Sequence, residues 1–167
     1  MNKDKNVDII KGALLLEHKG KALYESVIET SKVPEVKELF QMLADEEDHH
    51  ISVLKKQYSR LMKDQDFDVS ELESTHSDVS ENVVSSETVN NIFGAGYEAA
   101  VVSAALDFEK RAVEYYAQNA ENADSKPQKD LYQWLADWEK THMEMLAKID
   151  DDLKERIWFD NRFWPLD

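Results

Sequence analysis

Two segments of the chain contain a glutamate followed three residues later by a histidine, a spacing suited to metal binding. The first pair is Glu47 and His50, and the second is Glu139 and His142. Residues three apart lie on one face of a helix, about one turn from each other. Each pair can therefore direct a carboxylate and an imidazole at one ion, although a single pair is common on solvated helices and is weak evidence by itself.

The two pairs belong to an internal repeat that also contains an upstream glutamate and a tyrosine. Packing alone would preserve Leu and Ala, but it gives no reason to repeat acidic residues and histidines on otherwise apolar stripes. The alternative is a pair of duplicated helices with surface Glu–His pairs whose metal function is lost. The repeat aligns Glu17 with Glu109, Tyr24 with Tyr116, Glu47 with Glu139, and His50 with His142.

If each half folds as an antiparallel hairpin, the upstream glutamate returns to the level of its Glu–His pair. Four buried carboxylates without compensation would cost far more than the net stability of a domain, about 5–15 kcal/mol. Two divalent cations supply the matching charge, and oxygen and imidazole ligands suit iron or manganese, with zinc possible. The predicted metal ligands, which are also the predicted catalytic residues, are Glu17, Glu47, His50, Glu109, Glu139 and His142.

Four amphipathic segments are predicted to be the long helices that position these residues. With only four Gly and three Pro, the chain has few residues that would interrupt helices. Short loops within each half indicate two antiparallel hairpins, at about 8–62 and 97–156. The predicted helices span about 8–30, 34–62, 97–122 and 127–156. The expected inward stripe of the first helix is Ile10, Leu14, Glu17, Tyr24 and Ile28.

An acidic, Ser-rich connection over residues 64–91 joins the two hairpins. A connection of this length can cross a bundle from end to end, which is the one-crossover pattern of ferritin-like folds. The alternative is a disordered linker between independent hairpins, but an isolated hairpin cannot bury its apolar stripe. We therefore predict one all-α domain over residues 1–167, an up-down-down-up four-helix bundle with one long crossover and a short aromatic tail at 157–167.

Composition narrows the classes of function. The formal charge of −15 disfavours binding to nucleic acid or anionic membranes and attracts cations. The absence of Cys excludes disulfides, thiolate zinc sites and thiol catalysis. The opening MNKDKNVDII lacks the apolar core of a signal peptide, and no stretch is apolar enough to span a bilayer. We expect a cytoplasmic protein that binds neither nucleic acid nor membranes.

The segments ELFQMLADEEDHH and LYQWLADWEKTH resemble the rubrerythrin family of the ferritin-like di-iron carboxylate superfamily. The resemblance extends from about residue 8 to residue 153. It implies two bound iron ions, for which manganese or zinc could substitute. It further implies bridging roles for Glu47 and Glu139, terminal roles for Glu17 and Glu109, and one nitrogen ligand each from His50 and His142.

Two departures from the family bear on function. Full-length rubrerythrins carry a Cys-rich rubredoxin domain that delivers electrons, so a chain without Cys would need an external electron donor. They also have an additional carboxylate in the third helix, where this chain has Ala112, with Gly20 as its repeat mate. The remaining six-residue ligand set is similar to that of bacterioferritin.

The expected function is that of a di-iron oxidoreductase that reduces hydrogen peroxide or dioxygen as Fe(II) is oxidised. A ferroxidase that stores or handles iron is the alternative, and a non-enzymatic, metal-bound interaction protein is a further one. The aromatic tail residues Trp158, Phe159, Phe163 and Trp164 are expected either to fold back over an end of the bundle or to pack on a partner subunit. We also expect a homodimer, in which the hairpins could be exchanged between chains.

Residues beside the predicted ligands allow two interpretations. Asp45 and Asp137 either accept hydrogen bonds from the histidines or lie on the solvated face. Trp134 and Trp138 are expected to be packing residues, with an electron path as the alternative. His49 precedes a predicted ligand and is expected to be solvated.

Overall fold

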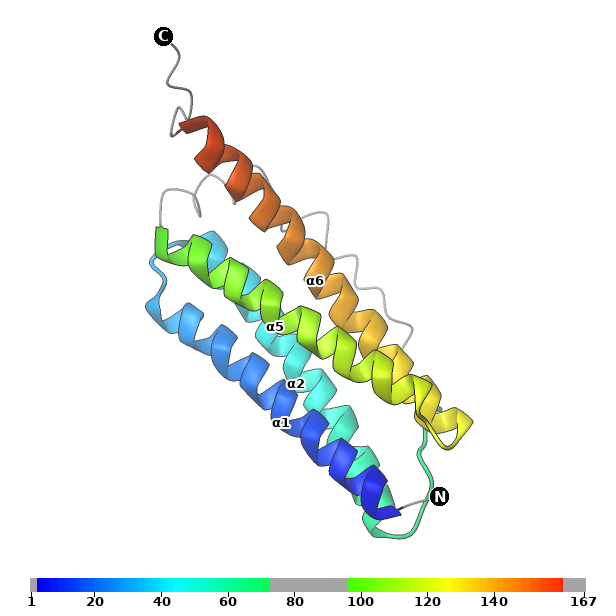
Figure 1. Ribbon diagram of the computed structural model, residues 1–167. Helices are drawn as coiled ribbons and strands as arrows, with labels where there is room; N and C mark the ends of the chain where they lie inside the picture. Colours follow the sequence, from blue (N-terminus) through cyan, green and yellow to red (C-terminus); the bar gives the residue numbers. More distant parts are fainter. Residues whose placement is uncertain (1–2, 73–95, 161–167) are drawn as a thin grey trace.

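The computed structural model describes residues 3–72 and 96–160, which form four long, roughly aligned helices (Figure 1). No strand occurs in these two ranges, which confirms the predicted all-α class. The helices are α1 (Lys3–Thr30), α2 (Pro34–Met62), α5 (Gly96–Glu121) and α6 (Lys126–Asp160).

The helices form two antiparallel hairpins that pack face to face. α1 pairs with α2, α5 pairs with α6, and α1 also contacts α5. α5 begins at the opposite end of the bundle from the end of α2, so the helix directions are up, down, down and up (Figure 1). Of the connection predicted at 64–91, residues 73–91 lie outside the described residues.

Local chemistry defines both ends of α2. Pro34 occupies the first turn, where its missing N–H costs nothing, and Val33 before it is extended, with φ of −94° and ψ of 114°. At the other end, Asp64 adopts a positive φ of 57° and ends the helical path. The chain then turns back along α2, because the Gln57 side-chain amide donates to the Asp68 carbonyl at 2.7 Å and accepts from the Asp68 N–H at 3.0 Å.

The bundle interior consists of two apolar clusters separated by a polar layer. One cluster lies between the α1–α2 loop end of the bundle and that layer and includes Val36, Phe40, Leu43, Leu146 and Ile149. The other lies on the opposite side and includes Ile10, Leu54, Phe67, Leu131 and Leu135. All six predicted ligands fall between the two clusters along their helices.

Most residues predicted to point inward are buried, and the exceptions are on α1. Leu14 and Ile28 are half-buried, whereas Ile10, Glu17 and Tyr24 are fully covered. At the other end of the chain, α6 continues through the first part of the predicted tail to Asp160 and extends beyond the other helices (Figure 1). Residues 161–167 of that tail lie outside the described part.

Within the described ranges, no helix combines the length and the apolar character that crossing a bilayer requires.

Candidate metal centre

The structure brings all six predicted ligands together in the polar layer at the middle of the bundle. Each hairpin contributes a glutamate from its first helix and a Glu–His pair from its second. Every one of the six is at most 2 % exposed. The set consists of Glu17 on α1, Glu47 and His50 on α2, Glu109 on α5, and Glu139 and His142 on α6.

These residues form two four-membered groups that share two carboxylates. In each group, one ligand atom per residue lies within 4.8 Å of the others. Glu47 and Glu139 belong to both groups, as bridging carboxylates would. One group contains Glu17, Glu47, His50 and Glu139, and the other contains Glu47, Glu109, Glu139 and His142.

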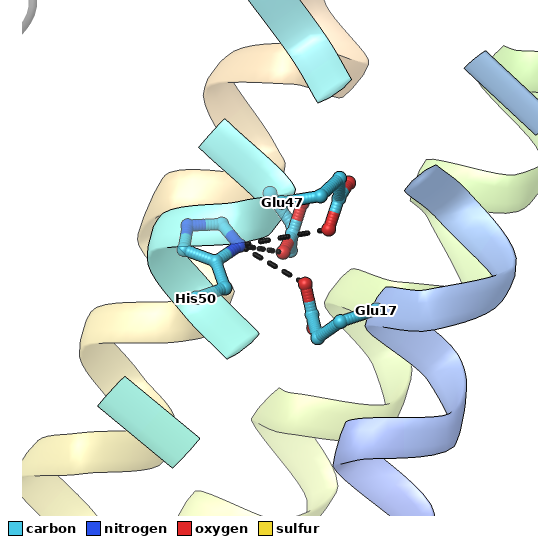
Figure 2. A group of neighbouring side chains, drawn as sticks. Glu17, Glu47 and His50 are labelled. Atoms are coloured by element: carbon cyan, nitrogen blue, oxygen red, sulfur yellow. Dashed lines mark hydrogen bonds and ion pairs between the residues drawn. The ribbon is translucent and has the colours of Figure 1, made fainter. Parts of the chain in front are cut away.

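His50 directs its Nδ1 atom at the carboxylates of three helices. This atom lies 2.9 Å from Glu139 Oε1, 3.1 Å from Glu17 Oε2 and 3.8 Å from Glu47 Oε2. Figure 2 shows the imidazole pointing at the carboxylates of Glu17 and Glu47. The Nδ1 side of the ring therefore faces the centre.

His142 occupies the equivalent place in the second group. Its Nδ1 atom lies 3.1 Å from Glu139 Oε2 and 3.5 Å from Glu109 Oε1. The two imidazole rings stack with their centroids 6.1 Å apart. Both histidines thus present the same nitrogen to one shared set of carboxylates.

Two buried tyrosines connect the hairpins through Glu17 and Glu109, the outer glutamates, which each belong to only one ligand group. Tyr24 on α1 donates its hydroxyl hydrogen to Glu109 on α5, and Tyr116 on α5 donates to Glu17 on α1. Both tyrosines are fully buried, and burial beside these carboxylates raises the pKa of each hydroxyl well above its usual value. They therefore remain neutral donors that hold Glu17 and Glu109 in place.

The crowded carboxylates do not ionise equally. Burial, reinforced by the charge of Glu139, raises the pKa of Glu47 well above its usual value and that of Glu109 to about 7. Burial also opposes ionisation of Glu139, but the adjacent His50 and His142 outweigh it and lower the pKa of Glu139. Without metal, the layer therefore retains protons on carboxyl groups that would be ionised in water.

The histidines carry compensating positive charge. Burial disfavours an imidazolium, yet the negative charge of Glu139 beside His50, and hydrogen bonds from both rings to the surrounding carboxylates, raise the pKa values of His50 and His142 well above the usual range. Protons on the two rings therefore supply positive charge beside the ionised Glu139. A cation at the centre would replace these protons.

A sequence profile of the rubrerythrin family matches residues 8–150, which is most of the chain. The chain belongs to the rubrerythrin family. This match confirms the resemblance inferred from the segments around the two Glu–His pairs. Searches of curated proteins and of solved structures found no significant match.

Rubrerythrins are di-iron proteins, and the side chains of this member fit a pair of such ions. Within the described part of the chain, neither oxygen of Glu47 has a hydrogen-bond partner, and Glu109 Oε2 also lacks one. Buried polar atoms normally find partners, so three unpaired carboxylate oxygens at one place fit the donors that a bound cation would use. Oxygen and imidazole donors without thiolate are the set that iron accepts.

The position of the family's additional carboxylate is small and buried in this rubrerythrin. Ala112 on α5 is 1 % exposed, and its repeat mate Gly20 is also covered. A Cβ atom added to Gly20 would lie 2.7 Å from Phe108 and 3.2 Å from Glu47 Oε1, so glycine allows both side chains to approach α1. Glu114, the next acidic residue along α5, is exposed.

The structure resolves the two interpretations of the aspartates. Asp45 and Asp137 are exposed, and each accepts a hydrogen bond from a glutamine one turn earlier, at 2.9 Å and 2.8 Å. Neither contacts a histidine of the centre. They lie on the solvated face of their helices.

The expectation that His49 is solvated is only partly correct. The residue is half-buried, and its ring lies 5.5 Å from Trp138 and 5.9 Å from Trp134, measured between centroids. Trp134 and Trp138 also pack on each other and on His50. The two tryptophans of α6 therefore pack against the histidines of α2, in keeping with their expected role as packing residues.

Sequence reasoning missed Glu46, which contacts the Nε2 atom of His142 and accepts a hydrogen bond from Trp138 Nε1 at 3.0 Å. The candidate ligands were chosen because the same residue type recurs in the other half of the repeat, whereas the residue equivalent to Glu46 is a tryptophan. Its place immediately before Glu47 was the only available signal.

Proposed function

We propose that this rubrerythrin-family protein is a di-iron oxidoreductase that reduces hydrogen peroxide or dioxygen while Fe(II) is oxidised. The observation that supports this most directly is that Glu47 and Glu139 belong to two adjacent ligand groups. When bound there, two ferrous ions would supply the two electrons that reduction of one peroxide molecule consumes. Manganese or zinc could occupy the same donors.

The roles of the side chains follow from the two groups. The shared carboxylates would bridge the two positions, and the outer carboxylates would be terminal ligands. Each imidazole would offer Nδ1, which is the nitrogen that faces the carboxylates. The bridging residues would be Glu47 and Glu139, one position would be completed by Glu17 and His50, and the other by Glu109 and His142.

The remainder of the bundle prepares these donors before a metal binds. The apolar clusters on both sides of the layer limit the access of water, which strengthens electrostatic interactions inside it. Tyr24 and Tyr116 fix the two outer carboxylates through hydrogen bonds from the opposite hairpin. The protein therefore supplies orientation and a low-dielectric layer, and the metal ions supply the electrons.

A ferroxidase that stores or handles iron is the alternative function. It is favoured by Ala112, since the buried alanine methyl cannot supply the additional carboxylate of rubrerythrins that reduce peroxide. Storage would also require a closed shell of many subunits. Size determination of the iron-loaded protein separates the two functions, because a small oligomer cannot enclose a mineral core.

We further propose that the protein is a cytoplasmic homodimer that receives electrons from an external donor. An external donor is proposed because these 167 residues contain no Cys for a rubredoxin-type site. Trp158, which is 57 % exposed on the extension of α6, offers apolar surface for a subunit contact. Light scattering at micromolar concentration tests the dimer, and a monomer would contradict it.

Anaerobic iron loading followed by a peroxide pulse tests the proposed activity. The loaded protein should consume about one peroxide for each pair of ferrous ions and should react faster with peroxide than with dioxygen. Glu139→Gln should abolish this consumption, whereas Asp137→Asn, on the solvated face of the same helix, should retain it. Faster reaction with dioxygen and growth of a ferric mineral would instead support the ferroxidase.

A further inference from the structure

Glu46 lies against the side of His142 that faces away from the carboxylate layer. Its carboxylate contacts Nε2 of the imidazole, whereas Nδ1 of the same ring points at Glu139 at 3.1 Å. The Glu46 side chain is only 15 % exposed. An ionised carboxylate can only accept hydrogen bonds, so the proton of a neutral His142 is held on Nε2 and the lone pair of Nδ1 faces the centre.

In the other half of the repeat, a tryptophan occupies the position equivalent to Glu46. Glu46 and Trp138 are 92 residues apart, the offset that also relates Glu47 to Glu139. Just as Glu46 lies against His142, Trp138 lies against His50, with ring centroids 5.1 Å apart in a T-shaped arrangement.

An indole offers no acceptor for an imidazole N–H. Accordingly, the buried Nε2 atom of His50 has no hydrogen-bond partner within the ranges that the structure describes. The Trp138 N–H is instead used to hold Glu46, to which it donates at 3.0 Å. Because Glu46 and Trp138 occupy equivalent positions of the repeat, His142 has a carboxylate against its outer nitrogen whereas His50 has an aromatic ring against its imidazole.

We infer that Glu46 is a positioning residue for His142 and makes the two metal positions unequal, with the Glu109–His142 position binding its ion more tightly. This inference rests on the proposed di-iron site. A carboxylate on the outer nitrogen fixes the orientation of a ligating imidazole and increases its basicity, and loss of such a partner typically costs about 10–100-fold in metal affinity. His50 lacks this restraint and is the ligand that can reorient more easily.

The test is an anaerobic titration of the metal-free full chain with Co²⁺, followed by visible absorption and calorimetry. Wild type should bind two ions with distinct affinities. Glu46→Ala should weaken one of them by about 10–100-fold and leave the other within about twofold. Asp45→Asn is the matched control, because it removes the same charge from the adjacent, exposed residue and should change neither affinity.

A second readout distinguishes positioning from a general loss of stability. In the Co²⁺-loaded wild type, two hyperfine-shifted imidazole N–H resonances are expected, one from each histidine. In Glu46→Ala, one should broaden through faster exchange with solvent while the other is unchanged. Trp138→Phe keeps an aromatic ring but removes the donor to Glu46, so it should produce a smaller change in the same resonance and affinity, even if Glu46→Ala folds poorly.

The outcomes separate this inference from the proposed function. If wild type binds two ions and Glu46→Ala weakens both equally or neither, the positioning role is wrong and the di-iron site stands. If wild type binds no pair of ions, the proposed function and the inference are both overturned. Weaker binding of only one ion, together with broadening of only one N–H resonance, would support the role of Glu46 as a positioning residue.

Discussion

The hydroxyl group of Tyr116 on α5 donates a hydrogen bond to Glu17 on α1. Tyr24 on α1 makes the reciprocal bond to Glu109 on α5. Each hairpin therefore orients the outer carboxylate of the other, and the two bonds join the halves of the bundle at the level of the metal centre. A repeated residue type at the same point in both halves gives this arrangement its approximate twofold symmetry.

Replacing either tyrosine by phenylalanine should destabilise the metal-free protein. Tyr116→Phe leaves Oε1 of the buried Glu17 without its donor, and an unsatisfied buried polar group costs about 1–3 kcal/mol. Chemical denaturation should show a decrease in the free energy of unfolding of this order. Tyr97→Phe, which removes a hydroxyl group from an exposed tyrosine, is the control and should have little effect. Unchanged stability in Tyr116→Phe would show that the contact with Glu17 is not formed in solution.

The shared carboxylates should be more important for metal loading than the outer ones. Glu47→Ala and Glu139→Ala each remove a member of both ligand groups, whereas Glu17→Ala removes a member of one. We expect the first two variants to lose both ions and Glu17→Ala to retain one. Elemental analysis after anaerobic iron loading measures this difference, and equal loss in all three variants would contradict the bridging roles.

Metal affinity should increase with pH through neutrality. In the metal-free layer the pKa of Glu109 is raised to about 7, and those of His50 and His142 are raised well above their usual values. Ligands must lose these protons to bind a cation, so at lower pH protons compete more strongly. Titration with Co²⁺ in buffers of different ionisation enthalpy should show proton release and tighter binding at pH 8 than at pH 6. Binding without proton release would contradict the assigned protonation.

The binding layer should also reduce the stability of the metal-free fold. Burial and the charge of Glu139 raise the pKa of Glu47 well above the value of 4.5 expected in water. Above that pH the unfolded chain releases a proton that the folded protein keeps, so folding becomes less favourable as pH rises.

Glu47→Gln removes this proton linkage while nearly preserving shape. The metal-free variant should therefore be more stable than wild type at pH 7, and the difference should disappear below pH 4.5. Thermal unfolding across this pH range measures the difference. A gap that stays constant with pH, or a variant less stable than wild type at pH 7, would show that Glu47 is ionised in the folded protein.

The fold and the ligand positions were largely predictable because two independent patterns agree. The apolar stripes of α2 and α6 have helical periodicity, and Glu47 and Glu139 interrupt them at the same point of the repeat. A charged residue on a buried stripe has few explanations other than a binding or catalytic site. Four helices with short loops inside each half then left few possible topologies.

Contacts between unlike polar residues were not predictable in the same way. Gln128 donates to Asn6 at 3.0 Å, and both residues are buried where the starts of α1 and α6 meet. Asn6 precedes the predicted start of the first helix at about residue 8, and no repeat relates the two residues. Glu46 was missed for a related reason, since its contact with His142 joins helices that are far apart in sequence and its repeat mate is Trp138.

The central claim is a pair of metal ions bridged by Glu47 and Glu139, and a crystal structure of the anaerobically iron-loaded protein tests it most directly. Anomalous scattering at the iron edge should locate two ions per chain in the polar layer. One should be bound by Glu17 and His50, the other by Glu109 and His142, with both shared carboxylates between them. A single ion, or ions bound only at the acidic surface, would contradict the account.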